Sequence, residues 1–148
     1  MKSRRKPDNS DALLCASCPI KVRFSEVDSV QITWHGSYVL YFDDAREDFG
    51  RRWGLDYMTI FNNGFYAPIV ELDFRFVKPL LYGDTARVDI FYKETHSAKI
   101  VFDYEIHSDK NDELLAFGHS VQVFLDREYQ LVPYTPEFYR KWKEEHLI

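Results

Sequence analysis

Apolar and polar residues alternate with a period of two over much of the second half of the chain, which is typical of half-buried strands. The alternation is regular over residues 70–76, 86–93, 100–106 and 114–126, and turn-forming residues separate these stretches. A shorter alternation predicts a strand over residues 20–24. The pattern therefore predicts one early strand and four later antiparallel strands in a meander-like succession.

From about residue 34 to Trp53 the period changes to that of a helix. Apolar residues recur there every three or four positions, and charged residues fill most of the other face. Gly54 follows as a suitable C-terminal cap. Shorter helices are predicted over residues 55–61 and 136–146. The apolar positions of the long helix are Tyr38, Tyr41, Phe42, Ala45, Phe49 and Trp53.

The aromatic content of the chain is high, at 17%, so flat rings make up much of the expected core. A single amphipathic helix with so many rings needs one large apolar sheet face to bury it. We therefore predict an α+β fold in which a curved antiparallel sheet wraps around one long central helix and exposes its other face to solvent. Residues 1–19 are polar and unpatterned, which predicts a mobile N-terminal leader, and residues 20–148 fit a single domain.

Charge and cysteine content argue against several classes of function. The net charge of −5 disfavours nucleic-acid binding, which needs a basic surface. No apolar run approaches the roughly 20 residues of a membrane-spanning helix, and the N-terminus lacks the apolar core of a signal peptide. We therefore expect a cytoplasmic protein with no membrane partner. Cys15 and Cys18 form a single CxxC with no second ligand pair, so we expect incidental thiols, no metal site and no cofactor.

Asp28 is a lone carboxylate a few residues upstream of the predicted helix start at Trp34 and His35. An Asp in such a loop commonly accepts hydrogen bonds from its own backbone and stabilises a turn. It can also orient and deprotonate a water molecule, beside the free N–H groups and positive dipole end of a helix N-terminus. The residues alone leave both interpretations open.

The segment DSVQITWHGSYVLYFDDARE resembles the signature of hotdog-fold acyl-CoA thioesterases of the 4-hydroxybenzoyl-CoA thioesterase type. Downstream, the pair Lys78-Pro79 and the turn Gly83-Asp84 resemble further motifs of that family, and the likeness extends from about residue 22 to residue 126. The chain departs from the family in the loop after the Asp, where a glycine is common and this chain has Ser-Val-Gln. The matching signature residues are Asp28, Trp34, His35, Ser37, Tyr38, Ala45 and Arg46.

The resemblance implies hydrolysis of an acyl-CoA to free acid and CoA. It assigns Asp28 the role of general base or nucleophile, and it places the oxyanion site at the backbone amides of His35 and Gly36. Trp34 and Tyr38 are then candidates to contact the acyl group, while the rest of the aromatic stripe is core. Lys78 is a candidate to meet the phosphates of CoA.

Three other functions remain in view. One is a thioesterase that takes its acyl group from acyl carrier protein, although the acidic charge of this chain disfavours docking an acidic carrier. Another is a non-catalytic hotdog protein that binds acyl or aromatic ligands. A hotdog dehydratase fits less well, because its catalytic His and acidic residue would occur in a different order. The resemblance also implies a homodimer or homotetramer, in which sheets pair edge to edge and each active site lies at a subunit boundary.

Overall fold

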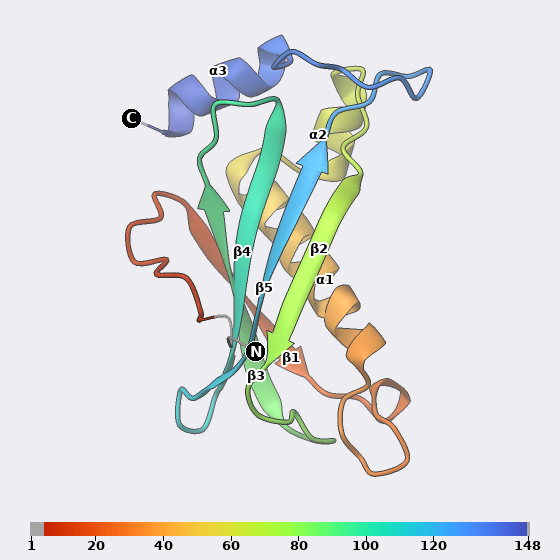
Figure 1. Ribbon diagram of the computed structural model, residues 1–148, viewed down its shortest axis with the longest axis vertical. Helices are drawn as coiled ribbons and strands as arrows, with labels where there is room; N and C mark the ends of the chain where they lie inside the picture. Colours follow the sequence, from red (N-terminus) through yellow and green to blue (C-terminus); the bar gives the residue numbers. More distant parts are fainter. Residues whose placement is uncertain (1–4, 148) are drawn as a thin grey trace.

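A five-stranded antiparallel sheet with the long helix α1 across one face forms the body of the protein (Figure 1). The structure, a computed structural model, describes residues 5–147. The predicted α+β class, with the sheet around one long helix, is confirmed. The strands are β1 (Cys15–Lys21), β2 (Ile69–Phe76), β3 (Thr85–Lys93), β4 (Lys99–Ser108) and β5 (Leu114–Val123). The helices are α1 (His35–Trp53), α2 (Tyr57–Asn62) and α3 (Glu137–His146), with a 3-10 turn at Phe24–Glu26.

The strand order is β1-β3-β4-β5-β2, which corrects the predicted meander of four strands. Strands β3, β4 and β5 do form a meander, but β2 pairs with β5 at the far edge of the sheet instead of with β3. The connection from β2 to β3 is held against the core. Leu80 in this connection is fully buried, and its carbonyl accepts a hydrogen bond from the Thr33 amide at 2.8 Å. Pairing between distant strands has no signature in local periodicity, so the alternation alone could not order them.

Small residues on β5 let α1 approach the sheet closely. A Cβ atom at Gly118 would lie 2.9 Å from the backbone oxygen of Asp73 and 3.2 Å from the ring of Phe42. Phe42 is fully buried, and its ring centroid lies 4.6 Å from that of Tyr104 on β4. The predicted core stripe of α1 is thus confirmed, and Gly54 ends the helix in the left-handed conformation, with a φ of 81°.

The N-terminal boundary differs from the prediction. Strand β1 begins at Cys15, five residues before the expected domain start, and residues after Lys21 are no longer part of it. Alternation along β1 buries Ala16 and exposes Cys15, and it places Cys15 and Cys18 on opposite faces of the sheet. Residues 15–19 of the strand were missed because Pro19 and polar residues interrupt the apolar pattern there.

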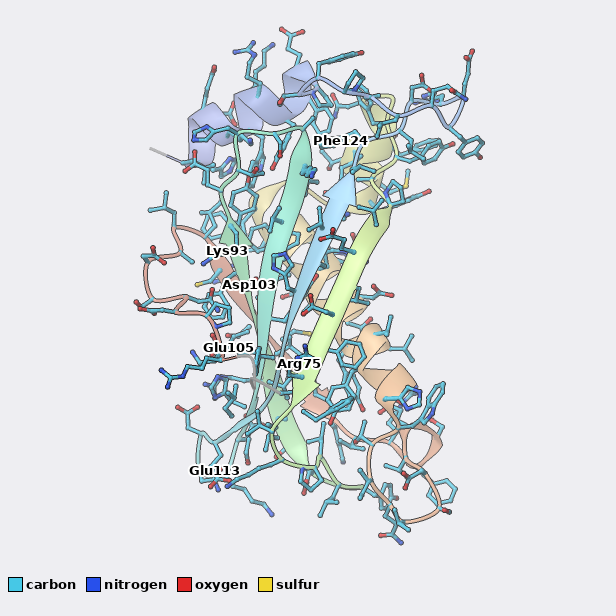
Figure 2. The ribbon with its side chains drawn as sticks, viewed as in Figure 1. Arg75, Lys93, Asp103, Glu105, Glu113 and Phe124 are labelled. Carbon is cyan, nitrogen blue, oxygen red and sulfur yellow. The ribbon has the colours of Figure 1, made fainter. Side chains whose placement is uncertain are left out.

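Part of the predicted leader packs on the outer face of the sheet. Asn9 is buried and donates a hydrogen bond to the carboxylate of Glu105 at 2.8 Å, while its own oxygen accepts one from Lys93 at 3.0 Å. Lys6 forms an ion pair with Glu105 at 3.3 Å. Figure 2 shows Lys93 and Glu105 on the neighbouring strands β3 and β4. The outer face is therefore not simply solvated, and only residues 1–4 of the leader lie outside the described residues.

Within residues 5–147, no helix has the length and apolar character needed to cross a membrane.

We predict that Asn9→Ala lowers the free energy of unfolding by about 1–3 kcal/mol, because a buried carboxylate loses its donor. Burial by itself raises the pKa of Glu105, but hydrogen bonds from Asn9 and His107 and the charge of Lys6 outweigh it and leave that pKa lowered. This stabilisation is present above the ordinary pKa of a carboxyl group and is lost as the pH falls through the lowered pKa. The difference in free energy of unfolding between Asn9→Ala and the unmodified protein should therefore shrink as the pH falls. Urea unfolding at several pH values measures it.

The exposed Asn62 at the end of α2 provides the control, and Asn62→Ala should leave the stability nearly unchanged. Equal stability of Asn9→Ala and the unmodified protein at neutral pH would show that the N-terminal segment adds nothing to the fold.

Candidate active site

One cleft brings together five of the six predicted site residues. This cleft, here called the Asp28 cleft, has a volume of about 380 Å³ and lies where the start of α1 meets the end of β2. Gly36 belongs to the same first turn of α1 but does not line the cleft. The predicted residues that line it are Asp28, Trp34, His35, Tyr38 and Lys78, joined by Ile32, Thr33, Phe76, Val77 and Pro79.

The two carboxylate oxygens of Asp28 have different surroundings. Oδ1 accepts hydrogen bonds from the backbone amides of Val30 at 2.9 Å and Ile32 at 3.2 Å. The Asp28 amide in turn donates to the Ile32 carbonyl at 2.9 Å. Oδ2 has no hydrogen-bond partner in the part of the chain that the structure describes, and the residue is exposed. The turn role and the catalytic role are therefore compatible, because one oxygen fixes the loop while the other remains available.

The loop after Asp28 adopts a conformation that usually requires glycine. Gln31 has a φ of 64°, in the left-handed region that a side chain makes unfavourable. This is the loop in which the resembled family commonly has a glycine. The loop thus keeps a glycine-like turn without the glycine, and it stores backbone strain next to the cleft.

Two amides at the start of α1 are free to bind an anion. The Trp34 amide donates to the Glu26 carbonyl at 2.8 Å, and the Ser37 amide donates to the Trp34 carbonyl at 2.9 Å. No acceptor for the His35 or Gly36 amide occurs within residues 5–147. The helix dipole adds positive potential at this end, where these two N–H groups have no acceptor.

The absence of a side chain at Gly36 makes room for the Trp34 ring. A Cβ atom at Gly36 would fall 2.1 Å from that ring, so the indole packs directly against the first turn of α1. The rings of Trp34 and His35 lie 4.9 Å apart, and Trp34 is 54% exposed. The exposed indole therefore forms an apolar wall next to the free amides.

Glu26 holds the loop against α1, a role that sequence reasoning missed. It is buried, its carboxylate accepts hydrogen bonds from the Tyr41 hydroxyl at 3.0 Å and the Arg23 amide at 2.9 Å, and its carbonyl also accepts one from the Ser37 hydroxyl at 3.0 Å. The contacts to Ser37 and Tyr41 span 11 and 15 residues of sequence, so no local spacing reveals them. They fix the position of Asp28 relative to the free amides.

Tyr38 and Lys78 occupy the floor and rim of the cleft. Tyr38 is only 2% exposed, its ring packs 5.0 Å from that of Phe76, and burial raises its pKa to about 12, so its hydroxyl stays neutral. Lys78 is half-exposed and pairs with Glu113 at 2.8 Å. A phosphate at the rim would compete with Glu113 for this ammonium group.

A second cavity, here called the far-end cavity, lies toward the other end of α1 and has a volume of about 570 Å³. It is bounded by α1, by α2 and by the residues just before β2, among them Ala67 and Pro68. Arg46 and Gln122 contribute polar atoms to its lining. Sequence reasoning did not predict it, because its walls come from segments far apart along the chain.

Among residues 5–147, no three side chains of His, Cys, Asp or Glu come together in a group that could hold a metal ion.

Comparison with known proteins identifies the family. Residues 22–142 match the thioesterase-like superfamily. The chain belongs to this superfamily. YneP of Bacillus subtilis (strain 168), provisionally named an acyl-CoA thioesterase, is 28% identical over 109 residues, which are 74% of this chain and 78% of YneP. The chloroplastic acyl-acyl carrier protein thioesterase ATL3 of Arabidopsis thaliana is 29% identical over 113 residues, 76% of this chain and 60% of ATL3.

Solved structures support the fold assignment. The DHNA-CoA thioesterase of Staphylococcus aureus superposes with a TM-score of 0.79 at 21% identity, covering 90% of this chain and 92% of that protein. The hotdog fold and the class of enzyme, a thioester hydrolase, are thereby confirmed. The comparisons do not single out the 4-hydroxybenzoyl-CoA type within the superfamily.

We predict that Gln31→Gly raises the free energy of unfolding by about 1 kcal/mol, because glycine adopts a positive φ without a steric penalty. Thermal or urea unfolding measures the change. The matched control is Ser29→Gly in the same loop, whose φ is not positive and which should gain nothing. A loss of stability in Gln31→Gly would contradict the interpretation of this turn as strained.

Proposed function

We propose that the protein hydrolyses acyl-CoA thioesters in the Asp28 cleft. The observation that supports this most directly is a cleft lined by both Asp28, with one free carboxylate oxygen, and His35, whose amide and that of the next residue are the free first amides of α1. Thioester hydrolysis needs these two elements, one to deliver an oxygen nucleophile and one to stabilise the carbonyl oxygen as it becomes negative.

In the proposed mechanism the thioester carbonyl lies between Asp28 and the start of α1. Its oxygen accepts hydrogen bonds from the His35 and Gly36 amides, which stabilise the tetrahedral oxyanion. Asp28 Oδ2 either takes a proton from the attacking water or attacks the carbonyl itself and forms an anhydride that water then opens. The C–S bond breaks with release of CoA thiol, and the acyl group leaves as a free acid. Trp34 and Tyr38 line the acyl side of the cleft, and Lys78 meets a CoA phosphate at its rim.

The active assembly in this proposal is a two-fold dimer paired through β2. Strand β1 is a poor pairing edge, because Pro19 lacks an N–H group and the Cys15 carbonyl already accepts the Trp53 indole N–H at 3.1 Å. Strand β2 has one free edge and carries exposed apolar side chains, Val70 and Phe76, each 55% exposed. A two-fold axis at this edge makes the two β2 strands antiparallel, as the resembled family's edge-to-edge pairing implies.

The acyl carrier is proposed to be CoA. The net charge of −5 is unfavourable for an acidic carrier protein. The similarity to an acyl carrier protein thioesterase makes the comparison worth measuring, with the same acyl group attached to CoA and to carrier protein. Faster hydrolysis of the carrier-bound form would overturn the assignment to CoA.

We predict that Asp28→Asn reduces thiol release from acyl-CoAs by at least ~100-fold, because an amide is neither a base nor a nucleophile at neutral pH. Asn retains an Oδ1 acceptor for the amides of Val30 and Ile32, so the loop should keep its conformation. A thiol-reactive dye follows turnover over a panel of acyl-CoAs of different length and aromaticity. The control is Asp109→Asn in an exposed turn, which should retain full activity. Unchanged turnover in Asp28→Asn would rule out the assigned role.

We also predict that Val70→Lys converts the dimer to a monomer, because the pairing edge would have to bury a charged ammonium group in place of an apolar side chain. Sedimentation velocity measures the assembly, and Leu13→Lys at another exposed apolar site serves as the control. A dimer that persists in Val70→Lys would show that another surface is used, and a tetramer would require a second interface.

A further inference from the structure

One aromatic side chain of α1 makes a buried polar contact beside the active site. Tyr41 was predicted as part of the apolar stripe of α1, and it is buried, with 5% of its surface exposed. Its hydroxyl donates a hydrogen bond to the buried carboxylate of Glu26 at 3.0 Å. Burial and this hydrogen bond raise the pKa of Tyr41, so the hydroxyl stays protonated and remains a donor. Tyr41 therefore does more than fill the core.

The hydroxyl of Tyr41 is next to both ends of the loop that carries Asp28. Glu26 precedes Asp28 by two residues, and Thr33 follows it by five. The Thr33 hydroxyl also interacts with that of Tyr41. Val27 and Thr33 form a backbone bridge across the base of the loop. Both ends of the loop therefore meet one side chain of α1.

The other side of this loop is held by backbone hydrogen bonds that do not involve Tyr41. The Gln31 carbonyl accepts one from the Tyr82 amide at 3.0 Å, and the Thr33 amide donates one to the Leu80 carbonyl at 2.8 Å. Loss of the Tyr41 hydroxyl should therefore leave the loop folded but free to shift relative to α1.

Tyr41 does not line the Asp28 cleft. It lines a separate hollow of about 300 Å³, together with Glu26, Lys21 and Asp44. A residue outside the cleft makes no contact with a substrate bound there. An effect of the Tyr41 hydroxyl on the reaction therefore has to pass through Glu26 and Thr33 to the loop, which separates positioning from substrate binding.

We propose that Tyr41 is a positioning residue for thioester hydrolysis, and that its hydroxyl sets the distance between Asp28 and the first amides of α1. This inference rests on the proposed function. Asp28 belongs to the loop, whereas the amides of His35 and Gly36 belong to the helix, so their relative position depends on how the loop is attached to α1. A misplacement of about 1 Å between reacting groups can cost a reaction about 100-fold in rate.

The variant Tyr41→Phe tests this role, because it removes the hydroxyl and keeps the ring. For the acyl-CoA that is hydrolysed best, we expect kcat to fall by roughly 10–100-fold and KM to stay within about threefold. The matched control is Tyr92→Phe, which also loses a buried hydrogen bond, to the Tyr139 hydroxyl at 2.5 Å, but does not line the Asp28 cleft. It should retain full kcat. An unchanged kcat in Tyr41→Phe would overturn the inference.

A double variant tests whether the hydroxyl acts through Asp28. In the Asp28→Asn background there is no carboxylate left to position, so adding Tyr41→Phe should change the residual rate by less than about twofold. A loss by the same factor in both backgrounds would show that the hydroxyl acts on the fold as a whole, and it would overturn the assignment.

Failure of the proposed function gives a different result, because no acyl-CoA then releases thiol even in the unmodified protein. The attachment of the loop is then decided by NMR, through proton exchange with water at the amides of Val30 and Ile32, which donate to Asp28 Oδ1. Tyr41→Phe should speed this exchange by at least ~10-fold, whereas Tyr92→Phe should leave it unchanged. Equal exchange in Tyr41→Phe and the unmodified protein would refute the inference without any measurement of activity.

Discussion

The apolar face of α1 must be buried against the sheet, and the other features of this protein depend on how that contact is made. The ring of Phe42 lies over Gly118, where a Cβ atom would come within 3.2 Å of it, so the absence of one side chain sets how closely the helix approaches. Close approach of large aromatic side chains also supplies most of the apolar burial available to a small domain. The helix is consequently held firmly along its length, and both of its ends keep fixed positions relative to the sheet edges.

A firmly held helix can present its first amides as a binding site. The Glu26 carbonyl engages Trp34 and Ser37, which flank the free amides, and the Glu26 carboxylate accepts the Tyr41 hydroxyl one turn further on. The loop that carries Asp28 is thereby attached to the same helix that carries the proposed oxyanion site. The strained backbone at Gln31 is tolerated because hydrogen bonds to Asp28 on both sides hold the turn. In the proposed mechanism, this rigidity keeps Asp28 and the oxyanion site at a fixed distance from each other.

Two groups of buried polar atoms in the protein have contrasting arrangements. On the outer face of the sheet, Glu105 is satisfied by Asn9, His107 and Lys6, so the group stabilises the fold. In the far-end cavity, Arg46 and Gln122 each keep one atom free within the described residues. Both residues line the far-end cavity, but the two unpaired atoms themselves are buried.

The sequence by itself determined what depends on neighbours along the chain. The periods of two and 3.6 residues located the four long strands and α1, Gly54 marked the end of that helix, and the motif around Asp28 indicated which residues meet in one cleft. These features are predictable because each arises within one element or one turn. The tertiary structure alone decided the position of β2 beside β5, the packing of Asn9 on Glu105, the contacts of Glu26 and the existence of the far-end cavity. Each of these joins segments far apart in sequence, for example 96 residues in the case of Asn9 and Glu105, and such contacts are set by three-dimensional packing rather than by local pattern.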